Sequence, residues 1–277
     1  MGREGVDRYG VMGYPVSHSR SPVIHRLFAL QTGQNLEYEL LAVPPGQLEA
    51  AVREFAEAGG RGLNITLPHK TAAAALADSL SERAGRAGAV NTLDFREGRV
   101  FGDNTDGAGL MRDLTRNLGL RLADLDILVL GAGGAVRGIL APLLAAAPRS
   151  VTIANRDVGK ARELANEFSS AVPVSACRFK EVPRSLHYSL LINATSAGLK
   201  GETPPWPQSS ISPDTFCYDL SYGLSPTPFS RWCTAQGAER VVMGWGMLVE
   251  QAAESFLLWR GIRPDTEPVL RQMSITA

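Results

Sequence analysis

Short apolar runs alternate with amphipathic segments along this chain, beginning in the first hundred residues. Runs of strand length that are bounded by turn residues predict strands at residues 9–12, 36–43, 62–67, 89–95 and 99–102. Segments with apolar residues at helical spacing predict helices at residues 22–32, 46–58, 71–77, 81–87 and 107–118. Ser21 and Pro22 are a typical N-cap and first residue for the first of these helices.

The alternation continues after residue 125. Strands are predicted at residues 126–130, 150–154, 174–177, 190–193, 215–220 and 240–243. Helices are predicted from the glycine turn at 131–134 to about residue 146, at 157–168 and at 247–259. Such alternation of strands and helices favours an α/β fold with a parallel sheet.

Length and composition limit the class of protein. The chain has 277 residues, enough for about two domains, and its 28 Lys and Arg residues balance its 28 Asp and Glu residues. This balance gives no electrostatic reason to expect a nucleic-acid or anionic-membrane partner. Residues 1–10 lack the apolar segment of a secretory signal, and the three cysteines form no CxxC pair. We therefore expect a soluble, cytoplasmic protein of a reducing compartment.

A glycine turn between a predicted strand and a predicted helix has the spacing of a dinucleotide-binding motif. Its sequence is GAGGAV, in which Gly131 allows a tight turn and Gly133 lets backbone N–H groups approach a pyrophosphate. Val136 stands where the common motif has its third glycine. The alternative interpretation is a turn that only packs a helix on a strand.

The end of the next strand indicates which nucleotide binds. NAD-selective folds usually place an acidic residue there, but this strand ends in Asn155 and Arg156, with Lys160 one turn later. Two cations favour a 2′-phosphate and therefore NADP. Asp157 leaves three interpretations open, because its carboxylate either repels that phosphate, holds a 2′-hydroxyl or caps the next helix.

Four polar segments stand at strand ends or helix starts, where α/β enzymes gather their sites. They are residues 17–22, 64–70, 89–91 and 102–107. Each has a structural alternative: Ser21 as a helix cap, Lys70 as a solvated lysine and Asp106 as an N-cap. The histidines at positions 18, 25 and 69 are either loop or core residues.

Metal and serine-nucleophile motifs are absent from the sequence. The loop at residues 103–106 is no EF-hand, because Gly102 takes the first ligand position. His18 and His25 form no HExxH pair, and Ser196 lacks the first glycine of a nucleophile elbow. We expect no metal and no covalent serine chemistry.

Taken together, seven motifs resemble the shikimate dehydrogenase (NADP+) family over the whole chain. They are VMGYPVSHSRSPVIH at 11–25, NITLPHK at 64–70, GAVNTL at 88–93, GDNTDGAG at 102–109, GAGGAVRG at 131–138, INATSAG at 192–198 and GWGMLVEQA at 244–252. The resemblance implies an NADP-dependent oxidoreductase that reversibly reduces 3-dehydroshikimate to shikimate, in chorismate and aromatic amino acid biosynthesis.

The resemblance also implies two α/β domains. A Rossmann-type, doubly wound nucleotide-binding domain at residues 107–242 is inserted in a discontinuous substrate domain. That domain consists of residues 1–106 and C-terminal helices at 243–277. In the family, the cleft between the domains holds the site. The expected partner is a small-molecule substrate, with no nucleic acid and no membrane, and the chain is expected to be a monomer or homodimer.

Residue roles follow from motif position in the family. Lys70 and Asp106 form the catalytic pair. The residues implied to bind substrate are Ser19, Ser21, Thr66, Asn91, Tyr222 and Gln251. The residues implied to bind the cofactor are Glu82, Gly131, Ala132, Gly133, Gly134, Ala135, Asn155, Arg156, Lys160, Thr195, Leu220, Gly244 and Met247. The chemistry agrees with the pair, because a ketone that accepts hydride develops alkoxide charge, which a lysine can hold and protonate.

Three positions depart from the family pattern. Tyr14 stands where asparagine is more usual, Asp157 where threonine is common, and Lys160 where arginine is frequent. The last two leave the choice between NADP and NAD open, because lysine is a point charge whereas arginine forms a planar fork. The alternatives are a quinate/shikimate dehydrogenase or a related paralogue, and a non-catalytic NADP-binding sensor. Another is a folate-linked two-domain dehydrogenase, against which the Ser19 and Ser21 loop argues.

Overall fold

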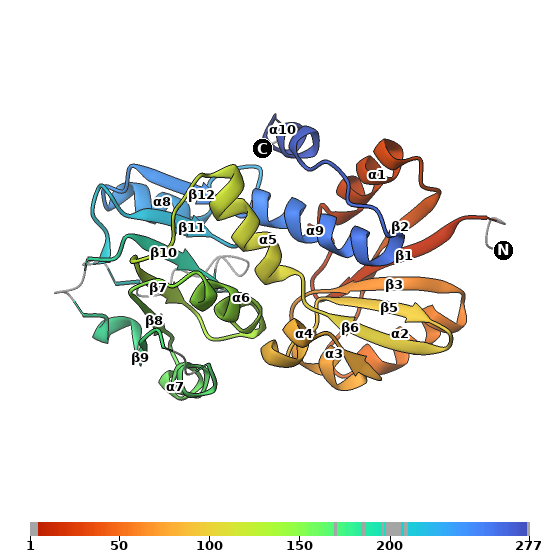
Figure 1. Cartoon of the computed structure of the whole chain (residues 1–277), viewed down its shortest axis with the longest axis horizontal. Helices are drawn as coiled ribbons and strands as arrows, with labels where there is room; N and C mark the ends of the chain where they lie inside the picture. Colours follow the sequence, from red (N-terminus) through yellow and green to blue (C-terminus); the bar gives the residue numbers. More distant parts are fainter. Residues whose placement is uncertain are drawn as a thin grey trace. The chain divides into compact units, whose positions relative to one another are not determined.

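The computed structural model describes residues 5–168, 171–183, 187–195, 197, 206–207 and 210–275. Ser196 and much of the loop around residues 201–209 lie outside the described residues. The chain divides into two compact units, residues 1–110 with 248–272 and residues 111–247 with 273–277 (Figure 1).

The first part of the chain alternates strands and short helices. In order, its elements are β1 (Asp7–Gly13), α1 (Ser21–Thr32), β2 (Leu36–Ala42), α2 (Leu48–Glu57), β3 (Gly60–Ile65), α3 (Lys70–Leu76), β4 (Ser79–Leu80), α4 (Glu82–Ala87), β5 (Thr92–Arg96), β6 (Arg99–Asp103) and α5 (Asp106–Arg112). The strands form one sheet in the order β2-β1-β3-β5-β6-β4. β1 pairs in parallel with β2 and β3, whereas β5 is antiparallel to β3 and β6. The sheet is therefore mixed, and the tight hairpin through Glu97 and Gly98 accounts for the antiparallel pairing of β5 with β6.

The second part contains a longer parallel array. Its elements are a π-helix (Asp113–Asn117), β7 (Asp126–Leu130), α6 (Gly134–Ala145), β8 (Ser150–Ala154), α7 (Val158–Glu167), β9 (Val174–Cys177), a 3₁₀ turn (Phe179–Glu181), β10 (Leu190–Asn193), β11 (Phe216–Asp219), α8 (Pro228–Ala235), β12 (Arg240–Met243), α9 (Trp245–Arg260) and α10 (Glu267–Ile275). All pairs of the sheet β12-β11-β10-β7-β8-β9 are parallel, as predicted.

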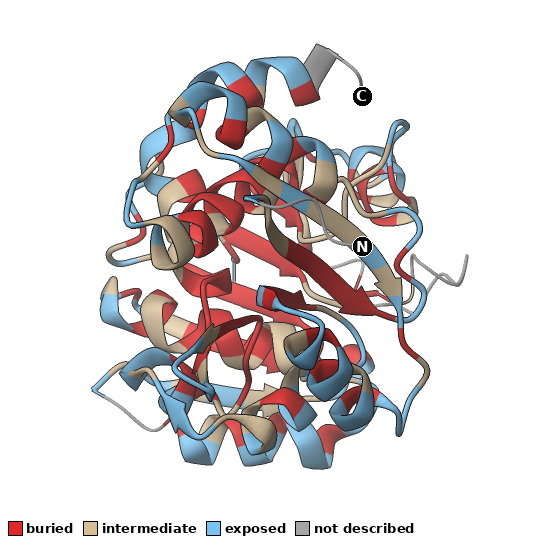
Figure 2. Ribbon diagram, turned by 90° about the vertical axis from the view of Figure 1, so that its right-hand side faces the viewer, coloured by how far each residue is buried: buried red, intermediate tan, exposed pale blue. Residues whose placement is uncertain are grey.

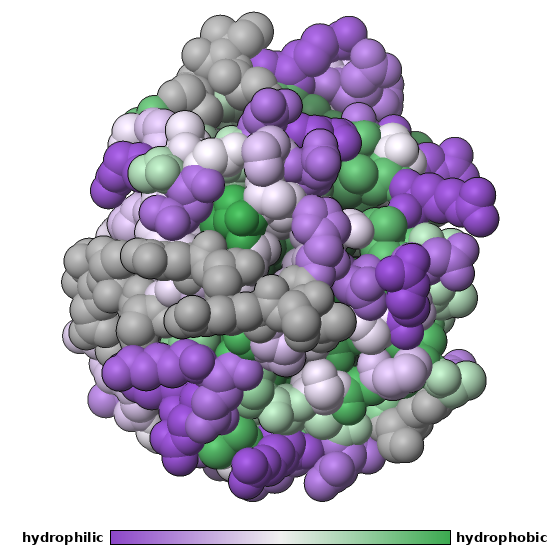
Figure 3. All heavy atoms as spheres, turned by 90° about the vertical axis from the view of Figure 1, so that its left-hand side faces the viewer, coloured by the Kyte–Doolittle hydropathy of each residue, from purple (hydrophilic) through white to green (hydrophobic). Residues whose placement is uncertain are grey.

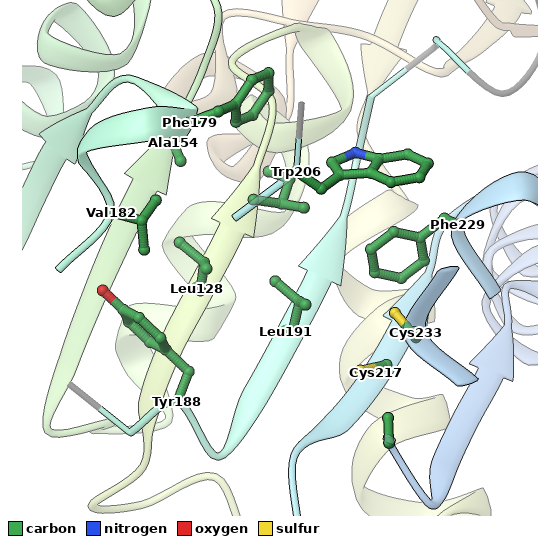
Figure 4. Packing of buried hydrophobic residues seen from close by; sticks show 12 residues of the cluster. Leu128, Ala154, Phe179, Val182, Tyr188, Leu191, Trp206, Cys217, Phe229 and Cys233 are labelled. Carbon is green, nitrogen blue, oxygen red and sulfur yellow. The ribbon is translucent and has the colours of Figure 1, made fainter. Parts of the chain in front are cut away.

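Burial explains why these strands read as continuous apolar runs. All five residues of β7 are buried, which is typical of a parallel strand covered on both faces. Figure 2 shows burial concentrated on the strands, while many helix residues are exposed. Figure 4 shows how Leu128 of β7 and Leu191 of β10 pack in one cluster with Tyr188 and Phe229. Cys217 and Cys233 belong to this cluster as free thiols.

Several elements differ from the prediction. The helix expected at 107–118 is an α-helix, α5, continued by the π-helical turn at Asp113–Asn117. The short helix α8 went unpredicted, although Thr227 caps it and Pro228 begins it. The apolar pattern located only one helix after residue 243, whereas the resemblance implied C-terminal helices at 243–277, of which α10 is the second.

The N-cap prediction for Ser21 is wrong. α1 begins at Ser21, its N-cap is Arg20, and no side chain caps it. Because the Ser21 side chain is not needed at the helix end, its hydroxyl is available for another role. Asp157, by contrast, is the N-cap of α7, and its Oδ1 accepts a hydrogen bond from the Gly159 N–H at 3.0 Å.

His25 is a core residue. Its ring is completely buried and stacks on Tyr38, with ring centroids 4.3 Å apart and planes 8° from parallel. Phe28 and Trp259 pack around the same ring. Burial disfavours the charged imidazolium and lowers the pKa of His25 to about 3.

This histidine makes stability depend on pH. Between its ordinary pKa of 6.5 and about 3, the unfolded chain binds the proton and the folded chain does not. The free energy of unfolding therefore falls as the pH drops below 6.5, by about 2 kcal/mol at pH 5 from this residue. We expect His25→Phe to remove this contribution, as measured by urea unfolding at pH 7.5, 6 and 5. Equal pH dependence of both proteins would contradict the assignment.

No helix among the described residues is long and apolar enough to cross a membrane. On the face shown in Figure 3, hydrophilic and hydrophobic side chains are interspersed.

Candidate active site

The first unit brings Lys70 and Asp106 together. Lys70 begins α3 and Asp106 begins α5, and the lysine Nζ lies 2.6 Å from the aspartate Oδ2. Their side chains are only 12% and 5% exposed. Lys70 is thus not a solvated surface lysine, and the pair is shielded enough for the two charges to interact strongly.

Asn91 fixes the other oxygen of this carboxylate. Its Nδ2 donates to Asp106 Oδ1 at 2.9 Å and to Thr105 Oγ1 at 2.8 Å. Its Oδ1 accepts from the Thr105 backbone N–H at 2.8 Å. Gln251 joins the group from α9, with its Oε1 3.3 Å from Asn91 Nδ2. Four predicted site residues, Lys70, Asn91, Asp106 and Gln251, therefore form one hydrogen-bonded network.

A buried carboxylate supports the loop that carries Asp106. Asp103 accepts hydrogen bonds from Ser81 Oγ at 2.5 Å and from Arg83 Nε at 2.7 Å. Burial raises the pKa of Asp103, but the hydrogen bonds from Arg83 and Ser81 outweigh it and hold the pKa below its usual value. The Asp103 carbonyl also accepts from the Asn91 N–H at 3.0 Å. No local signal in the sequence pointed to this role of Arg83.

Ser19 and Ser21 form a second polar group. Ser19 Oγ donates to Ser21 Oγ at 3.1 Å, and the Ser21 N–H lies 3.3 Å from Ser19 Oγ. Ser19 is half-buried and Ser21 is buried. Two adjacent hydroxyls and the start of helix α1 together suit a bound carboxylate.

The Thr66 loop lies beside the loop that leads to these serines. Thr66 is half-buried and follows β3, and its N–H donates to Met12 O of β1 at 2.9 Å. The Tyr14 N–H donates to Leu67 O at 2.9 Å. Because β1 and β3 are parallel neighbours, both loops leave the same edge of the sheet.

The other two histidines of the polar segments differ in burial. His69 is buried, and its Nε2 is 2.7 Å from Val43 O. His18 is exposed. Within the described residues, no group of three or more His, Cys, Asp or Glu side chains is arranged to hold a metal ion.

The glycine turn of the second unit fits a dinucleotide. It joins β7 to α6 and consists of Gly131, Ala132, Gly133, Gly134 and Ala135. Gly131 has a φ of +115°, and a Cβ there would lie 3.0 Å from Ala194 O, so only glycine is suitable. No side chain caps α6, and a Cβ at Gly133 would meet nothing within 4 Å. The helix N-terminus is therefore open for a pyrophosphate.

The turn also lies at the switch point of the sheet. β7 has β8 on one side and β10 on the other, and dinucleotides bind outside the carboxyl ends of strands at such a point. Arg156 and Lys160 are exposed beyond the end of β8, and Asn155 is half-buried. Of the three interpretations of Asp157, the structure shows the helix cap.

Other predicted cofactor residues stand at the carboxyl ends of the next strands. After β10, Thr195 Oγ1 donates to Asn193 Oδ1 at 2.8 Å. After β11, the Leu220 N–H donates to Asn193 O at 2.9 Å. After β12, the Gly244 N–H donates to Ser221 O at 3.0 Å. The three chain segments are thus tied to one another.

The other three predicted site residues lie in different elements. Met247 is buried in the first turn of α9. The Tyr222 ring lies 4.7 Å from the Trp245 ring, with the planes tilted by 46°. Glu82 is exposed in the first turn of α4, in the first unit, and no described contact links it to a nucleotide site.

Three family models match successive parts of the chain. They are described as the shikimate dehydrogenase substrate binding domain at residues 11–93, shikimate / quinate 5-dehydrogenase at 113–200 and the shikimate 5′-dehydrogenase C-terminal domain at 244–273.

Curated proteins and solved structures are similar over nearly the full length. The shikimate dehydrogenase (NADP(+)) of Methylococcus capsulatus is 56% identical, over 96% of this chain and 96% of its own. That of Alkalilimnicola ehrlichii is 54% identical, over 95% and 97%. The structure of shikimate 5-dehydrogenase from Thermus thermophilus, in complex with NADP(H) and shikimate, is 35% identical with a TM-score of 0.84, covering 98% of this chain and 100% of its own.

Proposed function

We propose that this chain, which belongs to the shikimate dehydrogenase family, catalyses the reversible NADPH-dependent reduction of 3-dehydroshikimate to shikimate. The observation that carries the reaction is the shielded Lys70–Asp106 pair. The substrate has a ketone to reduce, hydroxyls to hold and a carboxylate that stays charged. The first unit contains side chains that suit the ketone, the hydroxyls and the carboxylate.

The bound reduced nicotinamide supplies the hydride. The ketone oxygen then gains negative charge, and Lys70 stabilises this charge and donates a proton to the oxygen. Asp106 holds the lysine ammonium at 2.6 Å and accepts a hydrogen bond from a substrate hydroxyl. Asn91 keeps that carboxylate oriented, since it binds the second oxygen at 2.9 Å. In the reverse direction, Lys70 takes the proton from the alcohol.

The other residues bind rather than react. Ser19 and Ser21 hold the substrate carboxylate through their hydroxyls, with Tyr222 near it. Thr66, Asn91 and Gln251 bind the ring hydroxyls. We assign residues 1–106 and 243–277 to the substrate domain and residues 107–242 to the NADP domain, with Gly244 and Met247 of the C-terminal segment as further cofactor contacts.

The cofactor proposal is supported by the charges beyond β8. Arg156 and Lys160 are exposed there, and the Asp157 carboxylate is engaged with the Gly159 N–H of its own helix. This leaves the two cations to meet a 2′-phosphate. Glu82 stays a weaker member of the cofactor set. We place the protein in the cytoplasm, as a monomer or homodimer.

Initial rates of nicotinamide reduction test the proposal. Purified protein is given shikimate or quinate, each with NADP⁺ and with NAD⁺. We expect strong turnover only with shikimate and NADP⁺. Comparable turnover with quinate or NAD⁺ would shift the assignment to a broader quinate/shikimate enzyme. Nucleotide binding without turnover in any combination would support a non-catalytic sensor.

The carboxylate anchor gives a separate prediction. Ser19→Ala removes a hydroxyl from a group whose charge does not change in the reaction, so the lost binding is the same in the ground and transition states. We expect KM for shikimate to rise roughly tenfold or more, with kcat changed less than about twofold. Ser17→Ala, at an exposed neighbour, is the control. A loss confined to kcat would contradict the role.

A further inference from the structure

A buried tyrosine and aspartate in the second unit take no part in the proposed reaction. Tyr218 on β11 is completely buried, and its hydroxyl donates to Asp113 Oδ2 at 2.6 Å. Asp113 is 3% exposed and begins the π-helical turn after α5. The two residues are 105 positions apart in the sequence. Single π-helical turns are frequent at functional sites.

Tyr218 is held in its protonated form, and Asp113 has a second donor besides it. The second carboxylate oxygen of Asp113 accepts from Asn117 Nδ2 at 2.9 Å. Burial, followed by the charge of Asp113, raises the pKa of Tyr218 well above its usual value. Tyr218 is therefore a permanent donor toward Asp113. A buried carboxylate is costly unless such donors satisfy it, so each partner fixes the position of the other.

The same two residues contact the chain segment after β12. The Tyr218 hydroxyl accepts a hydrogen bond from the Met247 N–H at 3.3 Å. Gly246 packs against the Asp113 carboxylate so closely that a Cβ there would overlap it. At the other end of the segment, Gly244 is bound to Ser221 O. Hydrogen bonds therefore hold both ends of the segment 244–247, at Gly244 and at Met247.

The order of the strands in the sheet indicates which half of a dinucleotide residues 244–247 face. The Gly131 turn follows β7 at the switch point, and the candidate 2′-phosphate residues follow β8. In a doubly wound fold, the dinucleotide extends across the carboxyl ends of both halves of the sheet. The adenosine half belongs to the β7–β8 side. The remaining half, which carries the reactive nicotinamide, belongs to the β10–β12 side, where residues 244–247 stand.

We infer that Tyr218 and Asp113 are positioning residues for the nicotinamide half of the cofactor, acting through the segment 244–247. The inference rests on the proposed NADP binding and not on the identity of the second substrate. Neither residue touches the reacting atoms. Their hydrogen bonds hold the Met247 backbone and the Gly246 turn in the shape that receives the nicotinamide.

A pair of matched tyrosine variants tests the inference. Tyr218→Phe removes the hydroxyl that links Asp113 to Met247. Tyr188→Phe removes one from an equally buried tyrosine of the same unit, whose hydroxyl donates to Thr152 Oγ1 at 3.2 Å. Calorimetry measures the Kd of each variant for NADP⁺ and for 2′-phospho-ADP-ribose, which lacks the nicotinamide ring. Thermal unfolding of each variant reports its stability.

We expect Tyr218→Phe to weaken NADP⁺ binding about tenfold while binding of 2′-phospho-ADP-ribose changes less than about twofold. Tyr188→Phe should leave both unchanged. Asp113→Asn keeps an acceptor for Tyr218 but removes the charge, so it should show the same selective loss to a smaller extent. It replaces Tyr218→Phe in the test if that variant does not fold.

Two results would overturn the inference. The first is an equal loss for both ligands, which would indicate a general structural role. The second is a loss of similar size in Tyr188→Phe. Selective weakening of NADP⁺ binding supports the inference even if the protein does not turn over shikimate. In that case only the proposed reaction is refuted. Absence of NADP⁺ binding in the unmodified protein would refute both.

Discussion

Lys70→Ala is expected to lower kcat by about two to four orders of magnitude, with a modest change in KM for shikimate. The Lys70 side chain is 12% exposed and its ammonium is held 2.6 Å from Asp106 Oδ2, so water cannot readily replace it as proton donor to the ketone oxygen. Its interaction with that oxygen strengthens only as negative charge develops. The loss therefore appears in kcat rather than in binding. Steady-state rates with shikimate and NADP⁺ measure it.

Lys180→Ala is the control for this substitution, because Lys180 is exposed in the 3₁₀ turn of the second unit. We expect it to retain normal kcat. An unchanged kcat in Lys70→Ala would remove Lys70 from the reaction. Binding of 2′-phospho-ADP-ribose by Lys70→Ala confirms that the second unit is intact.

Asp106→Asn is expected to have the second large effect, a loss of kcat of about two to four orders of magnitude. The amide is nearly the same size, but it places an uncharged group against the Lys70 ammonium. An oxygen at the Oδ1 position could still accept from Asn91, so the residue should stay in place. What is lost is the negative charge that orients Lys70 and accepts the substrate hydroxyl.

A double substitution tests whether Lys70 and Asp106 act together in the reaction or contribute to kcat independently. Since Lys70 and Asp106 act as one unit, combining Lys70→Ala with Asp106→Asn should cost little more than either alone. Asp214→Asn, at an exposed turn position, is the matched control and should leave kcat unchanged. Multiplicative losses in the double variant would show that the two residues act independently, contrary to the proposed pair.

The strands of the second unit were predictable because each is a local apolar run. β7, β8, β9, β10 and β12 begin and end as expected, and β11 is only shorter by one residue at each end. The mixed sheet of the first unit was less predictable. Its hairpin was recognised, but pairing direction depends on which strands meet, and this is not a property of any one segment. α8 escaped notice even though Thr227 and Pro228 carry a helix-start signal.

The candidate site was likewise only partly predictable from the sequence. Local motifs pointed to Lys70, Asn91 and Asp106, and the family resemblance to the pairing of Lys70 with Asp106. Nothing in the sequence showed that Arg83 holds Asp103 or that Tyr218 holds Asp113. The interpretation of Ser21 as a helix cap failed because α1 begins one residue earlier than the capping pattern indicated.

The amino-acid sequence was enough to predict the alternation of strands and helices, the dinucleotide turn at Gly131, the family and the reaction that the family implies. Each of these rests on residues that are neighbours in the chain or on motifs of fixed spacing. The hydrogen bonds between side chains that are distant in the chain became visible only in the folded structure. Arg83 meets Asp103 across 20 residues and Tyr218 meets Asp113 across 105. Such contacts arise from how sheets and helices pack, which local periodicity does not encode.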